Sequence, residues 1–106
     1  MAEAAWVYLL RCADGSLYTG WTVDLDARLR SHGAGKASAY TRSRLPVELA
    51  LAFAMPDRSA AMREEARIKA LDRTQKLALI AAATTTGATA SVRLPNTAAG
   101  SASFDR

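Results

Sequence analysis

The stretch WVYLLRCADGSLYTG, residues 6–20, carries the strongest structural signal in the chain. It opens with apolar side chains, several of them β-branched or aromatic, which favours a strand over Trp6–Leu10. A second strand-like run, Leu17–Thr19, follows after Asp14-Gly15. An Asp-Gly pair between two such runs is a strong hairpin signal. The sequence therefore predicts an antiparallel hairpin with one tyrosine on each arm.

The remaining elements follow from apolar periodicity and from capping residues. A helix is predicted over Leu25–His32, a loop or short helix over Ser38–Arg44, and a third strand over Val47–Phe53. Two more helices are expected after it. The candidate caps and inward side chains of these helices are Thr22 or Asp24 with Leu25 and Leu29, Asp57 or Ser59 with Met62, Ile68 and Leu71, and Asp72 or Thr74 with Leu77 and Ile80. The predicted fold class is α+β, a small three-stranded antiparallel or mixed β-sheet flanked by helices.

The composition fits one small domain. The chain has 106 residues, of which 50% are hydrophobic, so it can form a single core. We place the domain at residues 1–83, because residues 84–106 are mostly alanine, threonine, serine and glycine. Such a segment buries too little apolar surface to offset its ordering entropy, which predicts a flexible C-terminal tail. The alternative is that Val92, Leu94 or Phe104 docks onto the domain.

Charge and cysteine content limit the classes of function. The formal net charge is +4, which is compatible with nucleic acid as a partner but also common among proteins that bind none. Cys12 is the only cysteine and His32 the only histidine, which excludes an intrachain disulfide and a zinc site built from these residue types. No stretch approaches the roughly 18 apolar residues of a membrane helix, and no signal peptide is evident. We therefore expect a cytoplasmic protein without a membrane partner.

Few side chains are candidates for chemistry. Tyr8 and Tyr18 lie on the two arms of the predicted hairpin, where neighbouring strands bring side chains together. Arg28 and His32 are four residues apart and project from the same helical face. The pair Glu64-Glu65 is adjacent on a helix, so at most one of the two faces any given cleft. Each residue alone also has an ordinary structural explanation, as core packing or as a solvated charge.

In combination, these residues make the sequence resemble the GIY-YIG nuclease family. The resemblance is to its small stand-alone bacterial branch, which is related to the nuclease domain of an excision-repair enzyme. The family takes its name from two tripeptides on a hairpin, and here they are Trp6-Val7-Tyr8 and Tyr18-Thr19-Gly20. Trp6 replaces the glycine of the first tripeptide and Thr19 the isoleucine of the second. Neither replacement removes a reacting group.

The resemblance continues from residue 5 to residue 80 and says nothing of residues 84–106. Its further matching positions are Arg28, His32, Tyr40-Thr41-Arg42, Arg58-Ser59 and Ile68-Lys69-Ala70-Leu71. The metal-binding glutamate of the family falls on Glu65, counting back from the last of these segments. Glu64 is the weaker alternative.

The resemblance implies a metal-dependent endonuclease that hydrolyses DNA phosphodiester bonds, with a role in DNA repair or recombination. The implied catalytic residues are Tyr8, Tyr18, Arg28, His32 and Glu65. Tyr8 would be the general base, Arg28 would contact the scissile phosphate, and Glu65 would bind Mg²⁺ or Mn²⁺. Since a free phenol has a pKa of about 10, we expect the metal or Arg28 to depress the pKa of Tyr8. Tyr18 and His32 would orient the water or the phosphate.

Basic side chains outside this set are candidates for DNA contacts. Arg11, Lys36, Arg42 and Arg44 could bind flanking phosphates, which gives affinity without sequence preference, or they could form a solvated basic surface. Three other functions stay open: a catalytically silent nucleic-acid-binding module with the same fold, cleavage of RNA, and a protein-interaction domain. A protein partner that supplies substrate specificity is also compatible with so small a chain.

Overall fold

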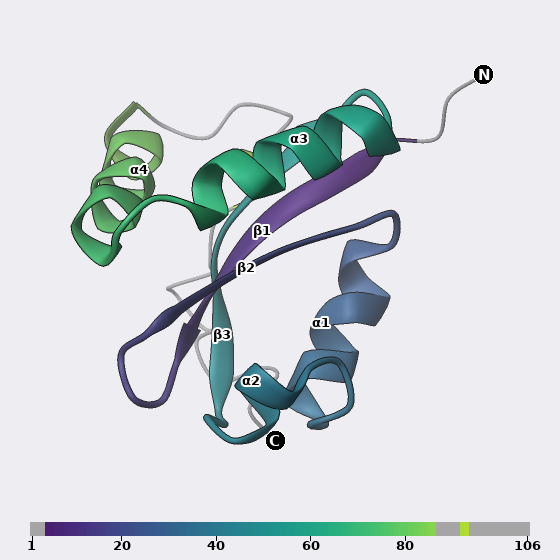
Figure 1. The fold of residues 1–106 in the computed structure, drawn as a ribbon, viewed down its shortest axis with the longest axis vertical. Coiled ribbons are helices and arrows are strands. Elements are labelled where there is room, and N and C mark those ends of the chain that lie inside the picture. Colours follow the sequence, from purple (N-terminus) through teal and green to yellow (C-terminus); the bar gives the residue numbers. More distant parts are fainter. Residues whose placement is uncertain (1–3, 87–91, 94–106) are drawn as a thin grey trace.

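One antiparallel sheet with helices on both of its faces forms the fold (Figure 1). The structure is a computed structural model and describes residues 4–86 and 92–93. The strands, in the sheet order β2-β1-β3-β4, are β1 (Ala5–Cys12), β2 (Leu17–Thr22), β3 (Val47–Met55) and β4 (Val92–Arg93). The helices are α1 (Leu25–Gly33), α2 (Ala39–Arg42), α3 (Arg58–Lys69) and α4 (Arg73–Thr86). Among the described residues, no helix is long and apolar enough to cross a membrane. The predicted α+β class is confirmed.

The β1–β2 hairpin forms as the sequence predicts. Its turn is closed by backbone hydrogen bonds from Cys12 N to Ser16 O and from Gly15 N to Cys12 O, each 2.9 Å long. Gly15 has a φ of 85°, a left-handed conformation that other residues rarely adopt. Asp14 Oδ1 accepts hydrogen bonds from the Ser16 amide at 3.0 Å and from the Ser16 hydroxyl at 2.6 Å. Asp14 and Gly15 thus shape the turn, and the turn fixes the register of the two strands.

An aspartate begins each of the three longer helices. The carboxylates of Asp24 at α1 and Asp57 at α3 accept hydrogen bonds from backbone amides three residues later. At α4, Asp72 Oδ1 accepts from the Gln75 amide at 2.8 Å, while Gln75 Oε1 accepts from the Asp72 amide at 3.0 Å. This reciprocal pair satisfies two of the backbone amides that a helix start leaves without partners. In each case the aspartate, and not the alternative serine or threonine, begins the helix.

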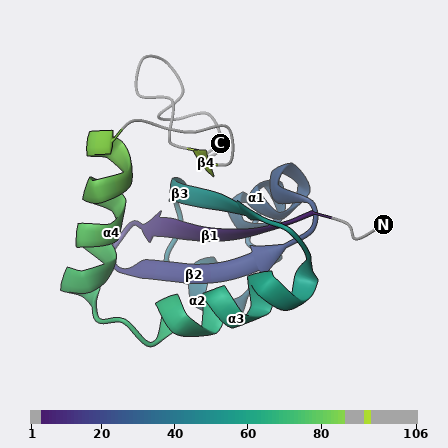
Figure 2. The same cartoon turned by 90° about the horizontal axis from the view of Figure 1, so that it is seen from above.

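Strand β1 is buried on both faces and separates two cores. Tyr8 and Leu10 pack with Leu25 of α1 on one face, while Leu9 packs in the cluster that contains Ile68 of α3 on the other. All three side chains of β1 are fully buried. Figures 1 and 2 show the consequence: α3 lies along one side of the sheet, and α1 and α2 lie on the other. A strand covered on both faces explains why its sequence is a continuous apolar run.

The apolar face of α3 differs from the prediction at one residue. Met62 was expected to point inward with Ile68, but it is 52% exposed. The side chain that shares the buried face with Ile68 is Ala61, which is fully buried. Seven residues make almost two full helical turns, whereas six leave the side chain well off that face. Spacing therefore selects the small Ala61 in place of the larger Met62.

Regular secondary structure continues beyond residue 83, the predicted end of the domain. Helix α4 continues to Thr86, past the predicted boundary at residue 83. Val92–Arg93 pairs with β3 as β4, which adds a fourth, very short strand to the three that were predicted. Most of the predicted flexible tail, residues 84–106, lies outside the described residues.

A buried hydroxyl on β2 generates a test of the packing. Thr19 is 2% exposed, and its Oγ1 has no hydrogen-bond partner among the described residues. A buried polar group without a partner costs free energy, so we expect Thr19→Val to raise the free energy of unfolding by about 1 kcal/mol. The measurement is the urea midpoint. Thr22→Val is the matched control and should lower the midpoint, because Thr22 Oγ1 accepts a hydrogen bond from the Asp24 amide at 3.1 Å. A lower midpoint for Thr19→Val would show that its hydroxyl is satisfied.

Candidate active site

Two tyrosines of the hairpin share one face of the sheet. Tyr8 on β1 is the cross-strand partner of Gly20, and Tyr18 lies two residues before Gly20 on β2. Because side chains alternate along a strand, Tyr18 points to the same face as Tyr8. Their ring centroids are 6.4 Å apart. The hairpin thus brings together the two tyrosines that the sequence placed on its arms.

Gly20 provides the space that the Tyr8 ring occupies. A Cβ atom at position 20 would lie 2.6 Å from Tyr8 Oη and 2.7 Å from Tyr8 Cζ, closer than real Cβ contacts. The phenol therefore lies directly over the backbone of Gly20. A glycine inside a strand often marks such a close approach. Sequence reasoning had included Gly20 in the second tripeptide without giving it a role.

A buried hydrogen bond joins Tyr8 to His32 of α1. Tyr8 Oη lies 2.8 Å from His32 Nε2, and His32 Nδ1 lies 2.8 Å from Thr41 Oγ1 of α2. Thr41 Oγ1 donates to the Ser38 carbonyl at 3.4 Å and lies 3.0 Å from Ser38 Oγ, so a lone pair of its oxygen can accept a hydrogen bond from Nδ1. That assignment puts the imidazole proton on Nδ1 and makes Nε2 the acceptor for the Tyr8 hydroxyl. The sequence had placed Thr41 in a segment that matches the family but gave it no role, since no local pattern links it to His32.

Arg28 places a positive charge beside this hydrogen bond. It lies on α1 one turn before His32 and is exposed, whereas His32 is fully buried. Burial lowers the pKa of His32 to about 4, and the charge of Arg28 contributes in the same direction. The imidazole is therefore neutral at neutral pH and can act as a hydrogen-bond acceptor.

The pKa of the Tyr8 phenol moves in the direction opposite to the one expected. Burial, followed by the neighbouring Tyr18, raises it to about 12, and Glu65 also raises it. Arg28 lowers this pKa through its charge and a hydrogen bond, as predicted, but its effect is smaller than that of burial. The expectation that Arg28 depresses the pKa of Tyr8 below its ordinary value is therefore wrong for the free protein. Tyr8 is a neutral phenol in this state.

Helix α3 contributes Glu65 to the surroundings of Tyr8. The Glu65 side chain is 18% exposed, and its Oε2 lies 3.1 Å from Lys69 Nζ. Glu64, the adjacent carboxylate, is bound by Arg67 at 2.6 Å, and this hydrogen bond lowers the pKa of Glu64. Of these two glutamates, Glu65 acts on the pKa of Tyr8 and Glu64 does not. The two carboxylates thus point to different neighbours, and the geometry favours Glu65 for the site.

The donor atoms at this place suit a hard divalent cation. The described residues contain no cluster of three or more histidine, cysteine, aspartate or glutamate side chains that could hold a metal ion. Mg²⁺ needs no such cluster, since it is commonly held by one or two carboxylates with water and substrate phosphate oxygens as the other ligands. The single carboxylate of Glu65 therefore fits Mg²⁺ or Mn²⁺ in the presence of a phosphodiester.

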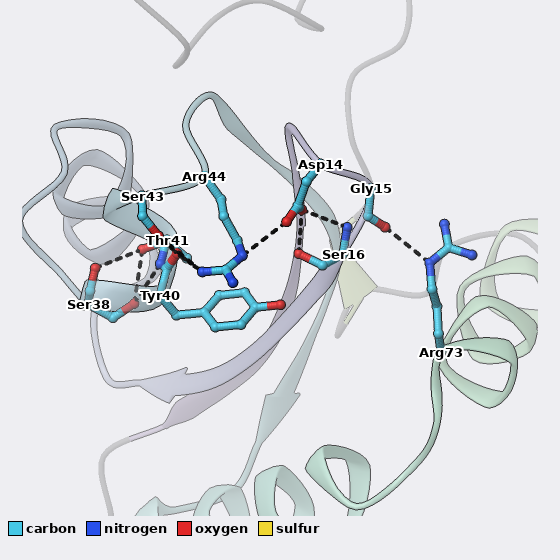
Figure 3. A network of polar contacts seen from close by, with 9 residues as sticks. All are labelled: Asp14, Gly15, Ser16, Ser38, Tyr40, Thr41, Ser43, Arg44 and Arg73. Carbon is cyan, nitrogen blue, oxygen red and sulfur yellow. Dashed lines mark hydrogen bonds and ion pairs between the residues drawn. The ribbon is translucent and has the colours of Figure 1, made fainter.

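Three of the four predicted DNA-contact residues lie at or near α2, and Arg11 lies elsewhere. Lys36 and Arg42 line a cavity of about 230 Å³ beside α2, whose other walls are Gly35, Ala37, Ser38 and Ala39. Arg44 is near α2 as well, but it is bound to Asp14 of the hairpin turn (Figure 3). Arg11 is exposed near the end of β1, and strand alternation places it on the α3 side of the sheet. Their contact with DNA stays a prediction.

The depressed pKa of His32 predicts that stability depends on pH. The folded state binds the His32 proton only near pH 4, whereas the unfolded chain binds it near pH 6.5. The free energy of unfolding is therefore unaffected by this proton above about pH 6.5. It falls as the pH falls toward 4, because the unfolded chain binds the proton before the folded state does. Between pH 7 and pH 5 we expect wild type to lose about 2 kcal/mol of unfolding free energy more than His32→Gln. Urea titrations at both pH values measure the difference, and equal losses in the two proteins would contradict it.

Known proteins match both the hairpin and the helices that build this site. A family model described as the GIY-YIG catalytic domain matches residues 4–78. The UPF0213 protein of Streptococcus sanguinis is 51% identical over 80 residues, which cover 76% of this chain and 92% of that protein. UPF0213 protein OB0043 of Oceanobacillus iheyensis is 50% identical, with 76% and 93% of the two chains covered.

A solved structure is also similar to the fold described above. The solution NMR structure of the UPF0213 protein BH0048 from Bacillus halodurans has 44% sequence identity to this chain and a TM-score of 0.50. The match covers 74% of this chain and 83% of that one. The family model spans the sheet face with Tyr8 and Tyr18 as well as the helices with His32 and Glu65. The chain therefore belongs to the GIY-YIG family of nuclease-type catalytic domains.

Proposed function

We propose that this protein is a divalent-metal-dependent endonuclease that hydrolyses DNA phosphodiester bonds. The observation that carries the proposal is the set of four side chains around Tyr8: His32 shares a hydrogen bond with its hydroxyl, Tyr18 packs beside its ring, and Arg28 and Glu65 both act on its pKa. These four side chains supply an aromatic ring, a cation, a proton acceptor and a carboxylate. Phosphodiester hydrolysis uses the last three, to stabilise charge on the phosphate, to take up a proton and to hold a metal ion.

The charges of the site suit the substrate and the transition state. Negative charge builds on the phosphate oxygens as water attacks the phosphorus, and Arg28 can donate two hydrogen bonds to them. A divalent cation at Glu65 would polarise the scissile phosphate and stabilise the leaving 3′ oxygen. Arg28 is exposed while His32 and Tyr8 are buried, so the guanidinium is the group that meets the DNA backbone first.

The Tyr8–His32 hydrogen bond suggests how the attacking water loses its proton. Tyr8 Oη accepts a proton from the water while its own proton passes along the 2.8 Å hydrogen bond to His32 Nε2. The high pKa of Tyr8 and the low pKa of His32 oppose this transfer in the free protein. Burial is the main cause of the low pKa of His32, and the charge of Arg28 is the second cause. A phosphate that pairs with Arg28 offsets the second of these causes. Substrate binding thus makes His32 a better acceptor, and the transfer is confined to the bound state.

The biological setting is proposed by analogy with the family alone. We place the activity in DNA repair or recombination, with a partner protein as a source of substrate specificity. A panel of DNA structures and RNA determines which nucleic acid is cut.

Glu65 and Glu64 offer a matched test of this function. Wild type, Glu65→Gln and Glu64→Gln are incubated with labelled single-stranded, flap and branched DNA, and with RNA, in the presence of Mg²⁺ or Mn²⁺. We expect Glu65→Gln to cut at least about 100-fold more slowly, because the loss of a metal ligand removes several kcal/mol of transition-state stabilisation. Glu64→Gln loses only its pair with Arg67 and should cut like wild type. Chelator should abolish cleavage.

A different pattern would favour the silent binding module. In that case wild type binds the panel without cutting any strand, and Glu65→Gln binds as well as wild type. If both glutamate variants instead cut as fast as wild type, the protein would be a nuclease in which Glu65 has no role.

A further inference from the structure

Helix α2 touches the candidate active site at two points. The Tyr40 ring packs on the Tyr18 ring with centroids 5.8 Å apart, and Thr41 Oγ1 lies 2.8 Å from His32 Nδ1. A helix of four residues has almost no stability of its own. Contacts from outside α2 must therefore hold it against Tyr18 and His32.

Arg44 makes those contacts just beyond the end of the helix. Its Nη1 donates to the Tyr40 carbonyl and to Ser43 Oγ, both at 3.0 Å, and its guanidinium carbon lies 3.8 Å from the centroid of the Tyr40 ring. Its Nε donates to Asp14 Oδ2 at 3.0 Å, in the turn of the β1–β2 hairpin (Figure 3). The Arg44 side chain thus contacts both the backbone and the ring of Tyr40 in α2, and it connects α2 to the hairpin turn through Asp14.

The hairpin turn is a firm anchor for this arginine. Asp14 is fixed by two hydrogen bonds from Ser16, which lower the pKa of its carboxyl, and the hydrogen bond from Arg44 acts in the same direction. The Ala13 amide donates to the Arg44 carbonyl at 2.9 Å. On the other side of the turn, Arg73 Nε donates to the Gly15 carbonyl at 3.1 Å. The turn is therefore held from both flanks, and its strands carry Tyr8 and Tyr18.

We propose that Arg44, paired with Asp14, is a positioning residue that holds Tyr40 and Thr41 against the active-site side chains Tyr18 and His32. The proposal rests on the proposed nuclease function and gives Arg44 a role other than the phosphate contact predicted from sequence. Most of the hydrogen-bond donors that Arg44 could offer to a phosphate already have partners within the protein. Nε and Nη1 are bound, and one face of the guanidinium covers the Tyr40 ring. A lysine retains the charge but has neither the planar face nor the fork of donors that these contacts require.

Arg44→Lys and Asp14→Asn test the proposal in the full chain, with Arg42→Lys as the matched control on α2 for the titration of His32 alone. The first readout needs no activity. His32 is the only histidine, so NMR can follow its ring protons through a pH titration without ambiguity. We expect the titration midpoint to rise from about 4 toward its ordinary value of about 6.5 in Arg44→Lys and Asp14→Asn, because a loosened α2 admits water to His32. Arg42→Lys should titrate like wild type.

The second readout separates positioning from phosphate binding. On the DNA of the panel that wild type cuts fastest, we expect kcat to fall at least about tenfold in Arg44→Lys and Asp14→Asn. The dependence of DNA affinity on salt should stay that of wild type. Asp14→Asn removes a negative charge, so a phosphate-binding Arg44 would make this variant bind DNA more tightly with unchanged kcat. That result, together with a wild-type His32 titration, would overturn the proposal.

The two hypotheses fail in different ways. If wild type cuts nothing in the panel but the His32 titration shifts in both variants, the nuclease proposal fails and the anchoring of α2 stands. If wild type cuts and neither variant changes kcat or the His32 titration, the role of Arg44 is refuted and the nuclease remains. Asp14 is half-exposed in a surface turn, so Asp14→Asn keeps the comparison valid should Arg44→Lys fail to fold.

Discussion

The hydrogen bond between Tyr8 Oη and His32 Nε2 connects strand β1 to helix α1 inside the protein, and both of its side chains are fully buried. Two polar groups removed from water must satisfy each other or lose free energy. The phenol is satisfied by the imidazole, and the imidazole by Thr41 on its other nitrogen. This chain of three side chains therefore links α1 and α2 to the sheet at the candidate active site.

The same burial sets the chemistry of the free protein. Because charge is costly in this environment, the phenol keeps its proton and the imidazole stays neutral. Arg28 and Glu65 bring opposite charges to the rim and act in opposite directions on the pKa of Tyr8. Both groups are thus neutral in the free protein. In the proposed nuclease, a phosphate that pairs with Arg28 would change this balance, so the site would have little tendency to activate water without a substrate.

The sheet gives these groups a rigid base. Strand β1 is covered on both faces, and Gly20 on β2 leaves room for the end of the Tyr8 ring. The Tyr40 ring packs on Tyr18, and Arg44 stacks on Tyr40 and binds Asp14 in the hairpin turn. The turn is far from Tyr8 along each strand, yet it is linked to the site through packed rings and short hydrogen bonds.

The hairpin, the helix starts and the shared face of the two tyrosines could all be predicted from sequence, because turns, caps and strand alternation depend on rules that act over a few residues. Family resemblance then gave the candidate side chains their catalytic roles and favoured Glu65 over Glu64. The partners of these residues could not be predicted. Thr41 reaches His32, and Arg44 reaches Asp14, across sequence separations that no local pattern records. Burial raises the pKa of Tyr8 by more than the nearby cation lowers it, and that comparison requires the packed environment. Local sequence fixes conformation, whereas desolvation and long-range contacts are properties of the assembled fold.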